Sequence, residues 1–255
     1  MHSVRVALIA ALVASSSTAS AAGRKHHFEP DDLELEQPGT LDIDLQAGPL
    51  RGDSDGKNRL LLPDFELGLG LTPEVQLELD GSFSLGDFDG TRRHLSADPL
   101  WIAAKLGLFD SRDSVGNVWA VGVELGPRLP LLNAAGVGYG ALGLFGFSRR
   151  GLHLVLNAGG LLDPGATLSA ERPRSVVIGL DLDAELDREK RWSAQSELGF
   201  AHYFSSDPQE LAFTLGATFA VSPKLDLSAT GLLGFLPGID HAGLLLGVSP
   251  ELDLW

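Results

Sequence analysis

The histidines of this sequence are the first residues to consider for catalysis, and there are seven of them. Hydrolysis by a serine needs a histidine base within reach and a third group that orients the base. His202 with Ser205 or Ser206 is the nearest such pair, but it falls in a predicted loop. His153 and Asn157 share one polar strand face, and no catalytic motif surrounds them. The sequence therefore predicts no enzyme.

Metal binding has three candidate sites, all of them incomplete. His26 and His27 lie in a polar N-terminal stretch without further ligands, so a solvated tail is the simpler interpretation. Residues 53–56 (DSDG) and 87–90 (DFDG) resemble the start of a calcium loop but lack its terminal glutamate. Asp-Gly is also ordinary turn chemistry. The sequence therefore predicts no metal and no cofactor.

Carboxylates that alternate with apolar residues are the charged groups with a regular spacing. In residues 66–83, ELGLGLTPEVQLELDGSF, apolar side chains alternate with acidic residues or glycine on both sides of a Thr-Pro-Glu turn. A period of two belongs to a β-strand with two unlike faces, so this stretch predicts a hairpin with one apolar and one acidic face. The pattern recurs along the chain. The predicted polar-face residues are Asp42, Asp44, Glu66, Glu78, Asp80, Lys105, Glu124, Asn157, Asp183 and Glu197.

If the polar face lines a lumen, its carboxylates set the electrostatic field there, with Lys105 as a counter-charge. Such a lumen favours cations or neutral organic molecules and disfavours anions. Glycines lie between the charged residues, and small residues suit a narrow lumen in which large side chains from opposite walls would collide. These glycines stand at positions 68, 70, 107, 122, 159 and 199.

The elements that would position these residues are about twelve strands, with no helical period among them. Many run for ten or more residues, which is the length of tilted membrane strands (about 9–11) rather than of soluble strands (about 5–6). The glycine-rich sixth segment leaves its apolar phase open. The alternating segments are 41–47, 65–71, 75–83, 100–108, 119–125, 137–147, 152–158, 176–186, 192–200, 211–219, 225–233 and 244–254.

The predicted connections alternate in length, as they do in outer-membrane barrels. Connections after even-numbered strands are short, whereas most of those after odd-numbered strands are longer. The link 109–117 breaks this rule, because it is long on the short-turn side. The short connections are 71–74, 147–151, 187–191 and 221–224, and the long ones are 49–58, 86–97 and 161–174.

The N-terminal residues 1–22 have the features of a cleaved secretory signal peptide. Arg5 precedes an apolar run that is too short to span a bilayer, and a small-x-small cleavage site follows at 19–21. Residues 23–38 form a polar lead, and 39–255 carry the strands. The exported chain has no cysteine, so it must fold without disulfides. The formal net charge of the full sequence, −15, argues against nucleic-acid binding.

Aromatic residues could anchor the strands at the membrane interfaces. Trp119 and Trp192 are the favoured anchors, because each stands near the start of its strand. Trp101, Tyr139 and Tyr203 are further candidates, and scattered packing residues are the alternative for all five. A soluble sandwich or lipid-binding barrel is the alternative fold. Its core would need large side chains, yet only 7% of the residues are aromatic.

Four stretches of the sequence resemble successive hairpins of bacterial outer-membrane barrels. The resemblance covers 39–255 and points to the transporter family labelled "MetA-pathway of phenol degradation". It implies a channel-like barrel for small aromatic or other organic compounds, without fixing the substrate. One departure concerns Trp255, because Glu251 and Asp253 share its phase and Pro250 interrupts the last strand. The stretches are ELGLGLTPEVQLEL (66–79), NVWAVGVELGPRLP (117–130), GLHLVLNAGGLLDPG (151–165) and VSPKLDLSATGLLGF (221–235).

Taken together, the sequence predicts an all-β protein, an antiparallel up-and-down transmembrane β-barrel in the outer membrane of a Gram-negative bacterium. The expected function is a passive channel or transporter for small organic molecules or cations. The expected partners are outer-membrane lipid, the barrel-insertion machinery and an unknown solute, and the barrel is expected to be a monomer. The alternatives are a non-conducting surface barrel with a structural, adhesive or partner-binding role, and a soluble periplasmic β-protein.

Overall fold

The computed structural model describes residues 35–52, 58–86, 94–114, 116–132, 134–165, 167, 172–204 and 208–255. The predicted signal peptide, most of the polar lead, the metal candidates at 26–27, 53–56 and 87–90, and both serines near His202 lie outside these residues. Among the described residues, no helix is long and apolar enough to cross a membrane.

The described residues form a closed antiparallel barrel, as the period-two pattern predicts. Twelve long strands follow one another around the barrel, and β1 pairs with β13 to close it. A short strand, β4, pairs with the end of β3 beside β5. The strands are β1 (Thr40–Arg51), β2 (Asn58–Thr72), β3 (Val75–Gly86), β4 (His94–Ala97), β5 (Leu100–Arg112), β6 (Val118–Leu129), β7 (Gly138–Arg149), β8 (Leu152–Leu162), β9 (Arg174–Glu185), β10 (Trp192–Tyr203), β11 (Glu210–Ser222), β12 (Leu225–Gly234) and β13 (Ala242–Asp253).

Side chains alternate between the inside and the outside of the barrel along every long strand. Strand β7 fixes the phase that the sequence left open, because Leu142 and Leu144 are buried inside while Tyr139 and Phe145 are exposed outside. Leucines also dominate the outer face of other strands, and Leu246 on β13 is 64% exposed. An apolar outer face around a closed barrel is the arrangement of a transmembrane barrel.

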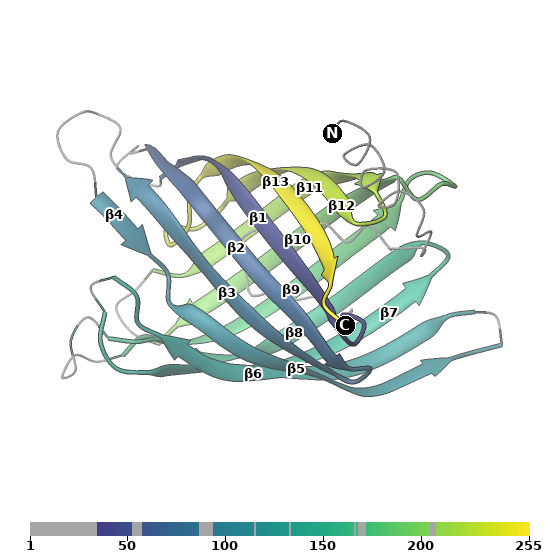
Figure 1. Ribbon diagram of the computed structural model, residues 1–255. Coiled ribbons are helices and arrows are strands. Elements are labelled where there is room, and N and C mark those ends of the chain that lie inside the picture. Colours follow the sequence, from purple (N-terminus) through teal and green to yellow (C-terminus); the bar gives the residue numbers. More distant parts are fainter. Residues whose placement is uncertain are drawn as a thin grey trace, which may run out of the picture.

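The two ends of the barrel differ in their connections. One end, called here the turn end, carries the short links 73–74, 150–151 and 223–224, and the other, called the loop end, carries the longer connections. Figure 1 shows the strands strongly inclined between these two ends. The residue that precedes β1 and the C-terminal residues meet at the turn end, where the backbone N–H of Leu254 donates to the carbonyl oxygen of Gly39 at 2.8 Å.

The link 109–117, which broke the length rule in the sequence, is shorter in the structure. Strand β5 continues to Arg112, so only 113–117 remain between β5 and β6. Asp113 closes this turn, since its carboxylate accepts hydrogen bonds from the backbone and side chain of Asn117. The extension was hidden by a bulge between Gly107 and Phe109, which shifts the alternation by one residue.

Candidate functional site

All ten predicted polar-face residues lie on the inner face of the sheet. Cross-strand pairing joins Asp44 to Glu66 and Glu66 to Asp80, which puts these three carboxylates on the same side. Six of the ten are buried: Asp44, Glu78, Lys105, Glu124, Asn157 and Glu197. The other four, Asp42, Glu66, Asp80 and Asp183, are half-buried.

One polar network joins β3 to β5 inside the barrel. The Lys105 ammonium lies 2.7 Å from Glu78 Oε1, and the amide of Gln76 donates to the same oxygen at 2.6 Å. Glu124 is the cross-strand neighbour of Lys105 on β6. Lys105 therefore forms a buried ion pair with Glu78, and its role as counter-charge in a lumen stays a prediction.

The remaining predicted residues belong to other parts of the wall. Asp42 and Asp44 stand on β1, where Asp44 accepts a hydrogen bond from the Ser249 hydroxyl of β13. Elsewhere on the wall, Glu197 of β10 accepts a hydrogen bond from Thr214 at 3.1 Å. The carboxylates therefore line the interior on several strands and do not converge on one reactive centre.

An inner apolar belt lies nearer the loop end, and sequence reasoning missed it. The interior of a transmembrane barrel is usually polar, yet two clusters of buried apolar residues occupy this level. The stretch 138–147, GYGALGLFGF, carried a signal, because apolar residues stand in both of its phases. The belt consists of Trp101, Ala103, Leu142, Leu144, Leu161, Val177, Ala201, Leu50, Leu61 and Leu245.

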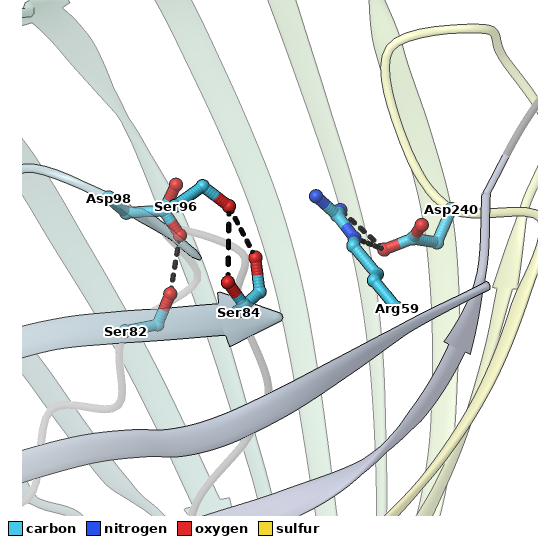
Figure 2. Close-up of polar contacts among 6 residues, drawn as sticks. All are labelled: Arg59, Ser82, Ser84, Ser96, Asp98 and Asp240. Atoms are coloured by element: carbon cyan, nitrogen blue, oxygen red, sulfur yellow. Dashed lines mark hydrogen bonds and ion pairs between the residues drawn. The ribbon is translucent and has the colours of Figure 1, made fainter. Parts of the chain in front are cut away.

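A polar wall faces the belt at the ends of β3 and β4. Ser82 donates a hydrogen bond to the Asp98 carboxylate at 2.5 Å, and the hydroxyls of Ser84 and Ser96 lie 2.6 Å apart. Figure 2 shows these contacts together with Arg59, on the neighbouring strand β2, and its partner Asp240. The serines on β3 continue the inner face that carries Glu78 and Asp80.

Two arginine–aspartate pairs hold the connections of the loop end against the wall. Arg59 of β2 contacts Asp240, in the connection before β13, with nitrogen–oxygen distances of 2.8 and 2.5 Å (Figure 2). Arg128 of β6 contacts Asp163, after β8, at 2.6 Å, and its guanidinium lies 5.5 Å from the Trp101 ring centre. Each pair reaches across an intervening strand, so each fixes a connection to the barrel rim.

These groups surround a cavity of about 270 Å³ at the loop end. Apolar belt residues such as Trp101 and Val177 line one part of it. Asp80, Asp98 and both arginine–aspartate pairs line the rest. The volume is close to the lower limit of small-molecule pockets, about 300 Å³. The cavity, called here the vestibule, therefore has room for a small solute with both apolar and hydrogen-bonding groups.

The two favoured anchors lie on the outer face near the turn end. Trp119 is exposed and packs against Phe147, with ring centres 4.4 Å apart, and Trp192 packs against Phe219 at 4.7 Å. Their contact with a membrane interface stays a prediction. Trp101 is different, because it is 5% exposed and lies inside the barrel, so it cannot be an anchor.

Comparison with known proteins supports the architecture. The sequence matches no family model and no curated protein. The fold is similar to that of the COG4313 outer membrane channel from Pseudomonas putida F1, with a TM-score of 0.59, 14% identity, and coverage of 89% of this chain and 100% of that one. It is also similar to the NanC porin, with a TM-score of 0.59, 10% identity, and coverage of 82% and 100%. The chain therefore has the fold of bacterial outer-membrane barrels.

Proposed function

We propose that the protein is an outer-membrane channel for small organic molecules, and that it prefers cations among ions. The observation that carries this proposal is the vestibule, which joins residues of the apolar belt to charged groups at one mouth of the barrel. A channel for hydrated ions alone has no use for buried apolar residues beside its path, whereas an organic solute gains from contact with both surfaces.

The buried carboxylates deeper in the barrel support the proposed preference for cations. Asp44, Glu78, Glu124 and Glu197 are all nearly inaccessible to water, and Lys105 is the cation paired among them. In a water-poor interior an excess of negative charge repels anions more strongly than it would in bulk water.

The same burial favours a second candidate function, a non-conducting barrel. Lys105, Asn157 and Glu197 are each 1% exposed, so the middle of the barrel is closed to water in this conformation. A barrel of this size can be filled by side chains. The closed middle therefore requires a channel that opens, and without opening the protein would act through its loops alone.

Solute flux distinguishes the two functions. The purified full chain is reconstituted into liposomes, and swelling is followed after addition of neutral solutes of increasing size. A channel predicts swelling that declines as solute volume exceeds that of the vestibule. A swelling rate equal to that of protein-free liposomes for every solute would support the non-conducting barrel.

The remaining parts of the proposal concern place and partners. The barrel fold supports insertion in the outer membrane of a Gram-negative bacterium after export, with lipid around its leucine-rich outer face and the barrel-insertion machinery as a transient partner. We expect a monomer without catalytic activity. The sequence resemblance to the phenol-degradation transporter family supports an organic solute and does not identify it.

A further inference from the structure

The segment before β1 turns into the barrel instead of leaving it. The turn lies at Pro38 and Gly39, where Gly39 has a φ of 86° that glycine adopts without strain. The Gly39 N–H donates to the Gly70 carbonyl at 2.9 Å, and the Thr40 N–H donates to the Gln37 carbonyl at 2.9 Å. These bonds reverse the chain at the turn end, so residues 35–37 lie against the inner wall.

Glycines on the inner wall provide the space for this segment. A side chain at Gly70 of β2 would overlap the backbone carbonyl oxygens of Glu36 and Gln37. A methyl group at Gly107 of β5 would come within 2.9 Å of Leu35 Cδ1. Both glycines share the inner face with the predicted polar residues, so their lack of a side chain leaves space for residues 35–37 over β2 and β5, called here the glycine groove.

Strand β3, between these two glycines, holds the segment by a hydrogen bond. The Glu36 N–H donates to Gln76 Oε1 at 2.6 Å. The amide nitrogen of the same Gln76 donates to Glu78, which pairs with Lys105. Glu36 is therefore linked through one side chain to the charged network at the middle of the barrel.

We propose that Leu35–Gln37 is an internal latch, seated in the glycine groove, whose release opens the turn end of the barrel. The proposal rests on the proposed channel function, because it names a part that moves when solute passes the turn end. The hydrogen bond from the Glu36 N–H to Gln76 is one of the contacts that hold the latch, whereas the wall beneath it is a continuous ladder of backbone hydrogen bonds between strands. The latch can therefore move without separating the strands of the wall.

A disulfide tests the seat and the function in one protein. The chain has no cysteine, so Glu36→Cys with Gly68→Cys introduces a single pair. Glu36 Cγ, the atom whose place a sulfur at position 36 would take, lies 3.6 Å from the position of a Cβ at Gly68, so the two introduced cysteines are neighbours. Conductance of the full-length variant is recorded in planar bilayers, oxidised and then reduced, and the disulfide is verified by mass spectrometry.

The latch predicts that the disulfide forms, that the oxidised variant loses at least about tenfold in mean conductance, and that reduction restores it. Failure of the disulfide to form would refute the seat. A disulfide that forms without changing conductance would refute the latch while leaving the channel function in place. If wild type and every variant fail to conduct, the channel function itself is wrong.

A glycine variant gives the opposite perturbation. Gly70→Ala places a methyl group where the Glu36 and Gln37 carbonyls lie, so the latch cannot seat. The expected result is at least about a twofold rise in open probability, with the urea unfolding midpoint close to that of wild type. Gly143→Ala is the matched control, because its nearest neighbour there is a backbone oxygen 3.7 Å away. Equal open probabilities in the two variants would contradict the proposal.

Discussion

Removal of the Lys105 ammonium tests whether the polar interior is as closed as the structure shows. The nitrogen lies 2.7 Å from Glu78 Oε1, and both side chains are at most 5% exposed. Breaking such a buried pair leaves an uncompensated charge and costs about 3–5 kcal/mol. We expect Lys105→Met to lower the unfolding free energy by about 3 kcal/mol, the lower end, because Gln76 still donates to Glu78.

The assay is urea unfolding of the full chain in phospholipid vesicles. Lys190 provides a matched control, because it also lies 2.7 Å from a carboxylate, that of Glu185, but its side chain is 55% exposed. Lys190→Met is expected to cost about 0–1 kcal/mol. The double variant Lys105→Met with Glu78→Gln should recover most of the loss, since the carboxylate that paired with Lys105 is then no longer left charged. Equal losses for Lys105→Met and Lys190→Met would refute the closed interior.

Three further predictions concern the outer face and the mouth. Leu156 lies outward midway along β8, so Leu156→Arg should lower the unfolding free energy in vesicles by about 2–4 kcal/mol; a loss below about 1 kcal/mol would place this face in water. Asp240→Asn leaves Arg59 without its carboxylate at the mouth, so the cation-to-anion permeability ratio should fall by about twofold or more. Glu189→Gln, on an exposed turn, is the control. An unchanged ratio would show that Arg59 does not influence passing ions. Trp192→Ala removes an outward ring that packs on Phe219, so it should lower the unfolding free energy by about 1 kcal/mol or more. If Trp192 is an interface anchor, the unfolding free energy falls further in vesicles than in detergent micelles. Equal decreases in the two would indicate packing alone.

The barrel could be predicted from the sequence because its cause is local. Each strand carries its own period of two, and the apolar phase at Leu67–Leu71 or Leu152–Leu156 is the phase that faces outward in the structure. The polar phase followed from the same alternation, so the ten inner-face residues could be named without knowledge of the contacts between them.

Features that depend on breaks in the period could not be predicted. The bulge at Gly107 and Phe109 shifts the alternation of β5, and the shift between Leu61 and Asp64 does the same in β2. A bulge leaves no sign in an apolar stretch, because leucine and phenylalanine suit either phase. The sequence therefore predicts too early an end for β5, which continues to Arg112, and too long a turn before β6.

Contacts between residues far apart in the chain were also hidden. Arg59 and Asp240 are separated by 181 positions in the chain. They meet only once the barrel has closed, because β1 then pairs with both β2 and β13. The contact of Gly70 with the residues before β1 was hidden for the same reason. The sequence indicated a narrow lumen at the glycines, but only the closed structure puts Glu36 and Gln37 against that position.

Reversal potential in a planar bilayer is the most direct test of the central claim, that solutes pass through an acidic barrel interior. The full chain and Gly70→Ala are each measured across a tenfold gradient of potassium chloride. The carboxylates on the inner face predict discrete conductance steps and a reversal potential that favours potassium over chloride. A preference for chloride, or an absence of conductance in both proteins, would contradict it.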